Sequence, residues 1–466
     1  MLPEPRLHDQ FLLSQRELVA PEWFTLHRFG SWYLYTGERL PVIPVLDGAT
    51  EVGWLLGWAV TPEGVLLGSE HPLQLSTADP EPTLTGLAGR WVCLLLGERP
   101  RVYLDVGGSL GVVYEPGVQV LGSTTTLVRK ATGRELDAPP PALVPNQFYP
   151  AGRTHDPLVS RLMPNHTLEL EEWRPRRHWP EGPLVQGTMA EVPREIETIL
   201  DEMRRLIVTL ASAAPLLLPL SGGRDSRMIL AAARPVAYES EYVTFRYADY
   251  RRLDALVARH VAKVLGLTRH ELGLRSPTAE ERAQYLEAIG HDASAGKARD
   301  FFVAARELSS DYGLLTGFGG GMGREIYAPK GARTDARELL GHSLAPATPA
   351  NISAVEDWLG SAPAGTREDI LHLYFLEVRQ GGWASPQFYG YAPFAFTLVP
   401  FMTRRSIEAM FRLPVDYRRA QTMVTDLIRA GWPELLEIPI ARRPGPIGVL
   451  DRAYLRLRHR VHNVLH

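Results

Sequence analysis

The sequence predicts a two-domain protein, in which an α+β domain of packed antiparallel sheets precedes an α/β domain built on a parallel sheet. Short strand-forming runs, interrupted by Gly, Pro and Asp, fill residues 1–183, as is typical of antiparallel sheets. Strand-like and helix-like runs alternate through residues 190–466, which is typical of a parallel sheet with helices on both faces. The length of 466 residues is consistent with two domains.

In the first domain, strands are expected at 32–35, 52–60, 91–96, 101–104, 110–114 and 119–121. A proline-rich stretch at 180–183 marks the expected boundary. In the second domain, apolar residues at helical spacing predict a first helix over 190–213. Strands are expected there at 216–220, 242–245 and 313–316, and further helices at 228–233, 253–265, 279–289 and 301–308.

Composition narrows the class of protein. The chain is 45% hydrophobic and 22% charged with a net charge of -3, so we expect no nucleic-acid partner. The one cysteine, Cys93, excludes an internal disulfide framework and a CxxC site, and its apolar neighbours predict a buried, inert thiol. No signal peptide and no apolar run of about 18 residues is evident, so we expect no membrane span and a cytoplasmic location.

The run LLLPLSGGRDSR, residues 216–227, carries the strongest functional signal. A buried strand that leads through Gly222 and Gly223 into a helix presents free backbone N–H groups and a positive helix end, which together bind anions. Ser221 and Ser226 add hydroxyl groups, and Asp225 is suited to hold magnesium. The spacing matches neither G-x-x-x-x-G-K-[ST] nor G-x-G-x-x-G.

Residues 221–226 resemble the SGG-x-DS pyrophosphate loop of the N-type ATP pyrophosphatases, which include asparagine, argininosuccinate and GMP synthetases. Those enzymes cleave ATP between the α- and β-phosphates and adenylate a substrate. The resemblance implies ATP and Mg²⁺ as cofactors and a Rossmann-like ATP-pyrophosphatase domain over 190–466. The residues that it places at the nucleotide are Leu220, Ser221, Gly222, Gly223, Arg224, Asp225, Ser226, Thr244, Phe245, Gly317 and Gly319.

Three further segments resemble parts of asparagine synthetases in particular. The hairpin series over 103–123 and the segment 161–180 are similar to parts of their glutaminase domain, which implies an Ntn-hydrolase-like β-sandwich over 1–183. The strand over 242–245 resembles the one that ends near adenine. Asp254, which follows it, is either the matching family acid or simply a helix-start residue.

The segment 314–324 resembles the family stretch LLSGEGADE, but its acids are missing. Phe318, Gly321 and Met322 stand where Glu, Asp and Glu are expected, so the charge of pyrophosphate needs another counter-charge. Arg324 or Glu325 is placed to supply compensation, the alternative being that the loop has lost the metal, and we assign Arg324 a catalytic role beside Asp225.

The last family segment, PFLD … R-x-K, is also altered. Thr403 replaces its aspartate, and its lysine is absent. Arg442 and Arg443 flank that gap, and we assign Arg443 the task of stabilising the developing oxyanion, the alternative being solvated surface charge.

The resemblance implies no glutaminase activity, because the chain begins Met1-Leu2-Pro3 and lacks the N-terminal cysteine nucleophile. Glutaminase-deficient relatives occur among β-lactam synthetases and lasso-peptide cyclases. The leading hypothesis is therefore an adenylating amide ligase that acts on a small-molecule or peptide carboxylate, with a homodimer or a biosynthetic enzyme as protein partner. The alternative is a catalytically reduced nucleotide-binding or scaffold protein. Transfer RNA thiolation is disfavoured, because the chain has no thiol pair.

Overall fold

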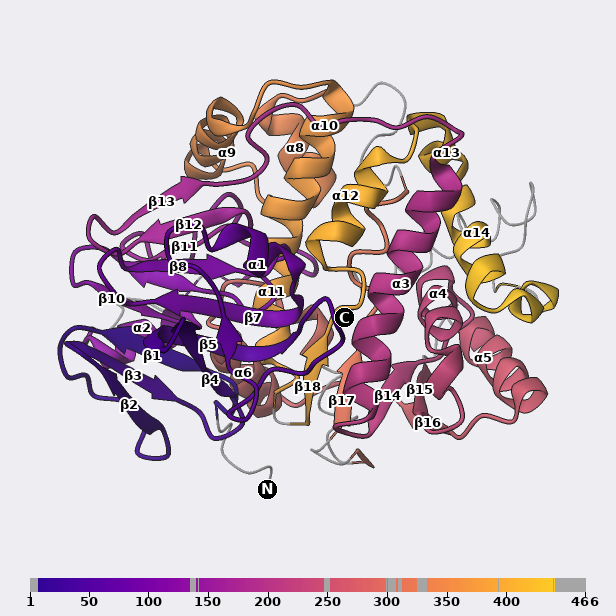
Figure 1. The fold of residues 1–466 in the computed structure, drawn as a ribbon, viewed down its shortest axis with the longest axis horizontal. Coiled ribbons are helices and arrows are strands. Elements are labelled where there is room, and N and C mark those ends of the chain that lie inside the picture. The colour runs from indigo at the N-terminus through magenta and orange to yellow at the C-terminus, as the bar shows by residue number, and fades with distance from the viewer. Residues whose placement is uncertain are drawn as a thin grey trace.

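The fold is seen in a computed structural model (Figure 1). It describes residues 7–134, 140, 142–246, 252–298, 300, 307–308, 312–324, 333–392, 394–438 and 440. Two sheets are formed by the N-terminal part of the chain, and a third, smaller sheet belongs to the C-terminal part.

The two N-terminal sheets are antiparallel apart from the pairing of β4 with β6. The six-stranded sheet has the order β11 (Ser160–Arg161), β9 (Val113–Glu115), β10 (Val120–Gly122), β1 (Phe11–Ser14), β3 (Trp32–Thr36), β2 (Thr25–Phe29). The seven-stranded sheet has the order β13 (Arg174–Arg177), β12 (His166–Glu169), β8 (Arg101–Leu104), β7 (Ala88–Leu95), β5 (Thr50–Val60), β4 (Val42–Asp47), β6 (Leu73–Gln74).

These sheets pack on one another through a shared hydrophobic core. Phe11, Leu13 and Leu34 of the first sheet join Leu56 and Val92 of the second in one buried cluster. Alternate residues of the same strands point outward and form two further clusters, which helices α2 (Thr125–Ala131) and α1 (Glu81–Gly86) help to cover.

The C-terminal sheet is wholly parallel. Its order is β16 (Arg269–Gly273), β15 (Glu241–Arg246), β14 (Leu216–Pro219), β17 (Tyr312–Leu315), β18 (Ala395–Leu398). The chain moves from β14 outward to β16 and then returns to the other side of β14 with β17. That reversal creates a topological switch point between β14 and β17, where ligands bind in open α/β sheets.

Helices cover one face of this sheet, to which β14 contributes Leu216 and Leu218. Figure 1 shows α3, α4 and α14 lying together on the right of the molecule, and each contacts the other two. The helices of this part are α3 (Val192–Ala211), α4 (Arg224–Ala232), α5 (Arg252–Leu265), α6 (Ala279–Ala288), α8 (Ala336–Ser343), α9 (Pro349–Ser361), α10 (Arg367–Leu373), the π-helix η3 (Tyr374–Ala384), α11 (Ser385–Tyr389), α12 (Arg404–Arg412), α13 (Val415–Ala420) and α14 (Thr422–Gly431). Three short 3₁₀ turns complete them: η1 (Arg234–Val236), η2 (Ala295–Lys297) and η4 (Pro433–Glu437).

Several sheets, one of them parallel, fit the predicted two-domain α/β fold. The Ntn-hydrolase-like character of residues 1–183 and the boundary near 183–190 stay predictions. The largest hydrophobic cluster crosses that boundary, since it joins Val60 and Phe148 to residues of the parallel sheet and its helices. The predicted helix over 301–308 lies outside the described residues except at its last two positions.

Two of the predicted elements begin at a different residue for a reason that the structure shows. The strand expected at 110–114 begins only at Val113, because the preceding backbone turns around the Asp105 carboxylate, which accepts hydrogen bonds from the N–H groups of Gly107, Ser109 and Leu110. Helix α4 begins four residues earlier than expected, at Arg224, because acidic and hydroxyl side chains are favourable in a first helical turn.

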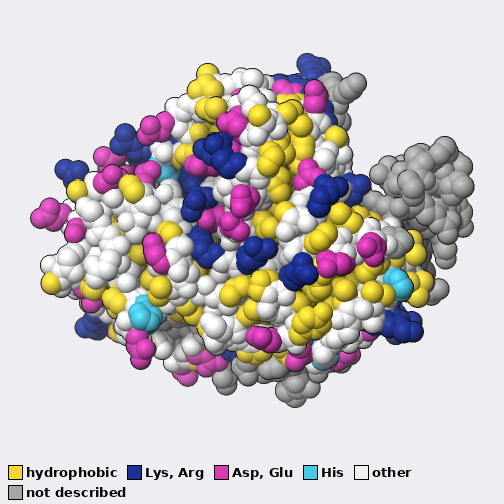
Figure 2. Space-filling view, turned by 45° about the vertical axis from the view of Figure 1, so that its right-hand side comes forward, with side chains coloured by type: hydrophobic (Ala, Val, Ile, Leu, Met, Phe, Trp, Pro, Cys, Tyr) yellow, Lys and Arg dark blue, Asp and Glu magenta, His cyan; other side chains and the backbone are white. Residues whose placement is uncertain are grey.

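The buried thiol, the helices and the surface charges can be compared with the predictions made from composition. Cys93 lies on β7, fully buried, and burial raises the pKa of its thiol far above the ordinary value. Over the described residues, no helix combines the length and apolarity that crossing a bilayer requires. Acidic and basic side chains are interspersed on the face shown in Figure 2. The absence of a nucleic-acid partner stays a prediction.

The N- and C-terminal parts are joined by a buried carboxylate. Asp292, which follows α6 and is 1% exposed, accepts hydrogen bonds from Thr125 Oγ1 at 2.6 Å and from Arg161 Nη2 at 2.7 Å. His155 Nδ1 lies 3.0 Å from the same carboxylate. Burial by itself would raise the pKa of Asp292, but the hydrogen bond with His155 and the charge of Arg161 outweigh it and hold this pKa below its ordinary value.

We predict that Asp292→Asn lowers the free energy of unfolding at pH 7 by about 3 kcal/mol, because it leaves the buried Arg161 without its counter-charge. The folded-state pKa is depressed, so the stabilisation is fully present above the unfolded pKa, about 3.9, and is lost as the pH falls through the folded value. Urea unfolding measured between pH 7 and pH 3 should therefore show that the free energies of unfolding of wild type and variant become more alike at the acid end.

Asp416→Asn is the matched control. Its carboxylate is 98% exposed and pairs with Arg419 at 3.6 Å, so its removal should leave the unfolding midpoint unchanged. An Asp292→Asn protein as stable as wild type at pH 7 would contradict the assigned role of the buried pair.

Candidate functional site

The candidate site lies at the switch point of the parallel sheet. The loop after β14 carries residues 220–223 and leads into α4, and the loop after β17 carries residues 316–324. Because β14 and β17 are parallel neighbours, both loops leave the same edge of the sheet. Residues about a hundred positions apart in the chain are thereby brought together.

The first loop is held by its own hydroxyl groups. Ser221 Oγ lies 2.8 Å from Ser226 Oγ and accepts a hydrogen bond from the Gly223 N–H at 3.0 Å. Gly223 is the N-cap of α4, and no side chain caps this helix end. The first N–H groups of any helix have no intrahelical partner, and here no side-chain cap takes their place. This geometry favours an anion.

The second loop approaches Asp225 directly. A Cβ atom added at Gly317 would lie 2.8 Å from Asp225 Cβ, so no larger residue fits there without displacement. Gly319 has φ +86°, a conformation that side chains other than glycine rarely adopt, and Phe401 and Met402 crowd it. Glycine at these two positions is what lets the loops touch.

Arg324 completes the contact between the loops. Its guanidinium donates to Asp225 Oδ1 at 2.5 Å from Nη2 and to the Gly320 carbonyl at 3.1 Å from Nε. Arg324 is 8% exposed, whereas the Asp225 side chain is 41% exposed. The structure thus brings together two of the three predicted catalytic residues. The third, Arg443, lies outside the described residues, as does Arg442.

The loops can be tested for their fit to magnesium. Among the described residues, no three His, Cys, Asp or Glu side chains cluster closely enough to hold a metal on their own. Magnesium bound with a nucleotide needs less, because one or two carboxylates act together with phosphate oxygens and water. A partly exposed Asp225 beside the helix end fits that requirement, with its Oδ1 already paired to Arg324.

The other predicted nucleotide residues have mainly structural contacts. Thr244 Oγ1 donates to the Leu220 carbonyl at 2.7 Å and so ties the end of β15 to the first loop. The Leu220 side chain belongs to the large core cluster, and Phe245 packs against the cluster on the opposite face. Arg224 donates to Gln421 at the start of α14. Because the Leu220 side chain is in the core, any nucleotide contact of Leu220 would come from its backbone.

Asp254 and Thr403 also have defined positions. Asp254 lies in the first turn of α5, where an acid is favourable to the helix. Thr403 is the N-cap of α12, and its hydroxyl accepts a hydrogen bond from the Ser406 N–H at 3.1 Å. The residue that stands in place of the family aspartate therefore starts a helix here.

Sequence analysis missed an aromatic group beside the second loop. Phe318 lies with its ring centroid 5.6 Å from that of Trp383 in the π-helix and 5.2 Å from that of Phe388 in α11. Nothing in local periodicity indicates a π-helix. The aromatic residue in place of a family acid was the available signal.

Arg227, in the same motif as Asp225, was also missed. It is buried in α4, and its guanidinium donates to the backbone carbonyls of Leu435, at 3.0 Å, and Ile438. Burial lowers its pKa. It fastens the segment after α14 to the helix whose N-terminus forms the site.

Comparison with known proteins gives limited but relevant support. No family model matches the chain. A stretch of 53 residues is 43% identical to 7-cyano-7-deazaguanine synthase from Cupriavidus necator, and it covers 11% of this chain and 23% of that protein. The chain thus matches less than a quarter of the length of this relative. The similarity is consistent with the N-type ATP pyrophosphatase superfamily and does not point to the asparagine synthetases in particular.

Proposed function

We propose that this protein is an ATP-dependent ligase that adenylates a carboxylate, releases pyrophosphate and passes the acyl group to an amine. The observation that carries the proposal is the meeting of residues 221–226 with residues 317–324 around Asp225 at the switch point. The partial similarity to a synthase supports the coarser statement that the chain is an ATP-utilising synthase or ligase. Amide formation, and a ring-closing reaction in natural-product biosynthesis, rest on the resemblance of the sequence alone.

In the proposed first step, the substrate carboxylate attacks the α-phosphorus of ATP, the bond to the bridging oxygen breaks, and pyrophosphate leaves. The uncapped N-terminus of α4, with Gly222 and Gly223, binds the departing phosphates through backbone N–H groups. Arg324 adds positive charge where the leaving group gains negative charge. Asp225 would hold magnesium, which neutralises phosphate charge when bound.

In the second step, an amine attacks the acyl carbon and AMP leaves. Arg443 is the residue we assign to the developing oxyanion. An arginine can stabilise that charge but cannot take up the amine proton, because its pKa is too high. The proton would therefore pass to another base or to solvent.

The alternative is a nucleotide-binding scaffold without turnover. The observation that favours it is the pairing of Asp225 with Arg324, since a carboxylate engaged by a guanidinium binds a metal less readily. The two functions differ in one measurable respect. A scaffold binds α,β-methylene-ATP, whose α–β bridge resists cleavage, but releases no pyrophosphate from ATP with any carboxylate.

We expect Asp225→Asn to lower the rate of pyrophosphate release about 100-fold in the presence of ATP, Mg²⁺ and a panel of carboxylates, because phosphate charge loses its metal-holding group. A coupled pyrophosphate assay gives the rate. Asp201→Asn on α3, whose carboxylate is exposed and pairs with Arg204, is the control and should match wild type. Equal rates for Asp225→Asn and wild type would exclude the ligase assignment.

A second variant separates charge from loop structure. Arg324→Gln should lower pyrophosphate release about 100-fold, while Arg324→Lys should retain an intermediate rate, because lysine keeps the charge but not the fork that also binds the Gly320 carbonyl. Binding of α,β-methylene-ATP and the thermal midpoint should be recorded with each variant. Identical rates for the Gln and Lys variants, with unchanged midpoints, would show that the charge of Arg324 does not act in the reaction.

A further inference from the structure

A second candidate site lies at the edge of the parallel sheet where strands β14 and β18 begin. Its cavity measures about 300 Å³ and is lined by Asp9, Arg39, Leu40, Gly57, Trp58, Arg90, Leu110, Ala214, Ala392, Ala395 and Phe396. Ala214 precedes β14 and Ala395 opens β18, so the cavity lies at the amino-terminal ends of these strands. The nucleotide loops follow the opposite ends, roughly 13 Å away along a four-residue strand.

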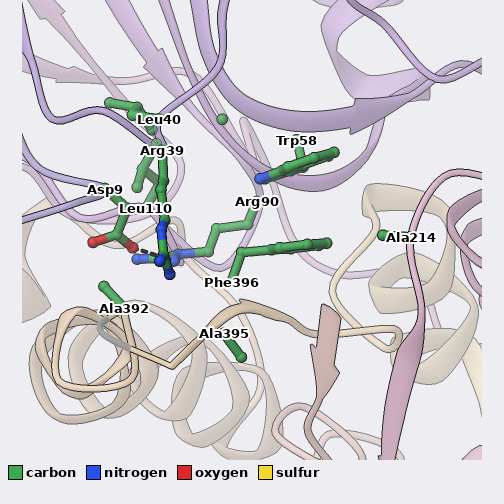
Figure 3. Close-up of a pocket in the computed structure, with 11 residues that line it drawn as sticks. Asp9, Arg39, Leu40, Trp58, Arg90, Leu110, Ala214, Ala392, Ala395 and Phe396 are labelled. Atoms are coloured by element: carbon green, nitrogen blue, oxygen red, sulfur yellow. Dashed lines mark hydrogen bonds and ion pairs between the residues drawn. The ribbon is translucent and has the colours of Figure 1, made fainter. Parts of the chain in front are cut away.

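One end of the cavity is charged. Arg90 Nη1 donates to Asp9 Oδ2 at 2.8 Å, and Arg90 Nε donates to the Ser109 carbonyl at 3.0 Å. Figure 3 shows the heads of Arg39 and Arg90 converging beside the Asp9 carboxylate. Two guanidinium groups face one carboxylate here, and burial also acts to raise the pKa of Asp9. Among the described residues that line the cavity, two arginines and one acid thus meet at this end.

Two polar atoms at this end have no hydrogen-bond partner among the residues that the structure describes. They are Arg90 Nη2 and Asp9 Oδ1, on side chains that are 4% and 9% exposed. A buried donor or acceptor without a partner is costly, and such atoms are usually satisfied by protein, water or a ligand. Arg90 Nη2 needs a hydrogen-bond acceptor, and Asp9 Oδ1 needs a donor.

The other end of the cavity is apolar. Trp58 of β5 stacks on Phe396 of β18, with ring centroids 4.2 Å apart and planes inclined by 12°. In Figure 3 this aromatic pair lies to one side of the charged heads, and Ala214 lies beyond it. The cavity has room for a small organic molecule.

We propose that this cavity binds a small monocarboxylate that carries a hydrogen-bond donor beside the carboxylate and has an apolar body, as an apolar amino acid does. The carboxylate accepts from Arg90 Nη2 and takes the positive charge of the arginine pair. The donor satisfies Asp9 Oδ1, and the body lies against Trp58 and Phe396. This inference does not depend on the proposed ligase activity.

The ligand would also join the two parts of the chain. The charged end and Trp58 come from the N-terminal sheets, whereas Phe396 comes from the C-terminal sheet. A ligand in the cavity contacts both, so binding should raise the thermal midpoint of the whole chain.

Isothermal titration of the full chain, without ATP, tests the proposal with four probes. L-phenylalanine should bind, and three analogues should bind at least ten-fold more weakly. L-phenylalaninamide lacks the carboxylate, 3-phenylpropanoate lacks the donor, and L-glutamine has a polar body. Equal or tighter binding of any analogue, or no binding of L-phenylalanine, overturns the corresponding assignment.

Variants locate the binding. Arg39→Gln, at an exposed side chain, should weaken L-phenylalanine binding at least ten-fold. Arg16→Gln, an exposed arginine outside the cavity lining, is the matched control and should bind as wild type does. Asp225→Asn should also bind as wild type does, which separates this site from the nucleotide loops. An unchanged affinity in Arg39→Gln, or a loss in Asp225→Asn, would place the ligand elsewhere.

Discussion

The buried Glu377 carboxylate is the constraint on which the arrangement of this molecule depends. Its side chain, inside the π-helix, is screened from solvent and accepts from Arg177 Nη2 at 2.7 Å, Asn165 Nδ2 at 3.2 Å and Trp358 Nε1 at 2.8 Å. A buried carboxylate is tolerated only when charge and hydrogen bonds compensate its lost hydration. Two of these three partners belong to the N-terminal sheet region, so the π-helix reaches its place only with that region docked.

That constraint extends to the candidate nucleotide site. Trp383, six residues after Glu377 in the same π-helix, packs against Phe318, which directly follows the glycine that touches Asp225. A continuous series of contacts therefore runs from the N-terminal sheets to Asp225 and the loop at residues 221–226. The N-terminal sheets therefore have a physical role here, because they fix the position of one wall of the candidate site.

Local sequence patterns predicted much of the secondary structure and the anion loop. The strand at 101–104, the long helix α3 and the strand-to-helix turn at 221–226 depend on periodicity and turn residues, which short windows contain. The pairing of Asp225 with Arg324 joins residues 99 positions apart. The cavity around Arg90 is lined by residues from widely separated parts of the chain, from Asp9 to Phe396. Such contacts depend on how whole sheets pack together, and a short stretch of sequence does not indicate which distant residues will meet. The role of Arg324 was inferred only because acids were missing around it.

The charges on the two loops also explain how the loops can lie so close. Two facing carboxylates at this distance would repel one another unless a cation lay between them. With Arg324 in the second loop, Asp225 meets an opposite charge, and the glycines at 317 and 320 can press against it. The guanidinium of the buried Arg324, which donates to the Gly320 carbonyl, remains beside the uncapped end of α4. The second loop therefore presents a fixed positive charge to Asp225, which suits an anion beside this helix end.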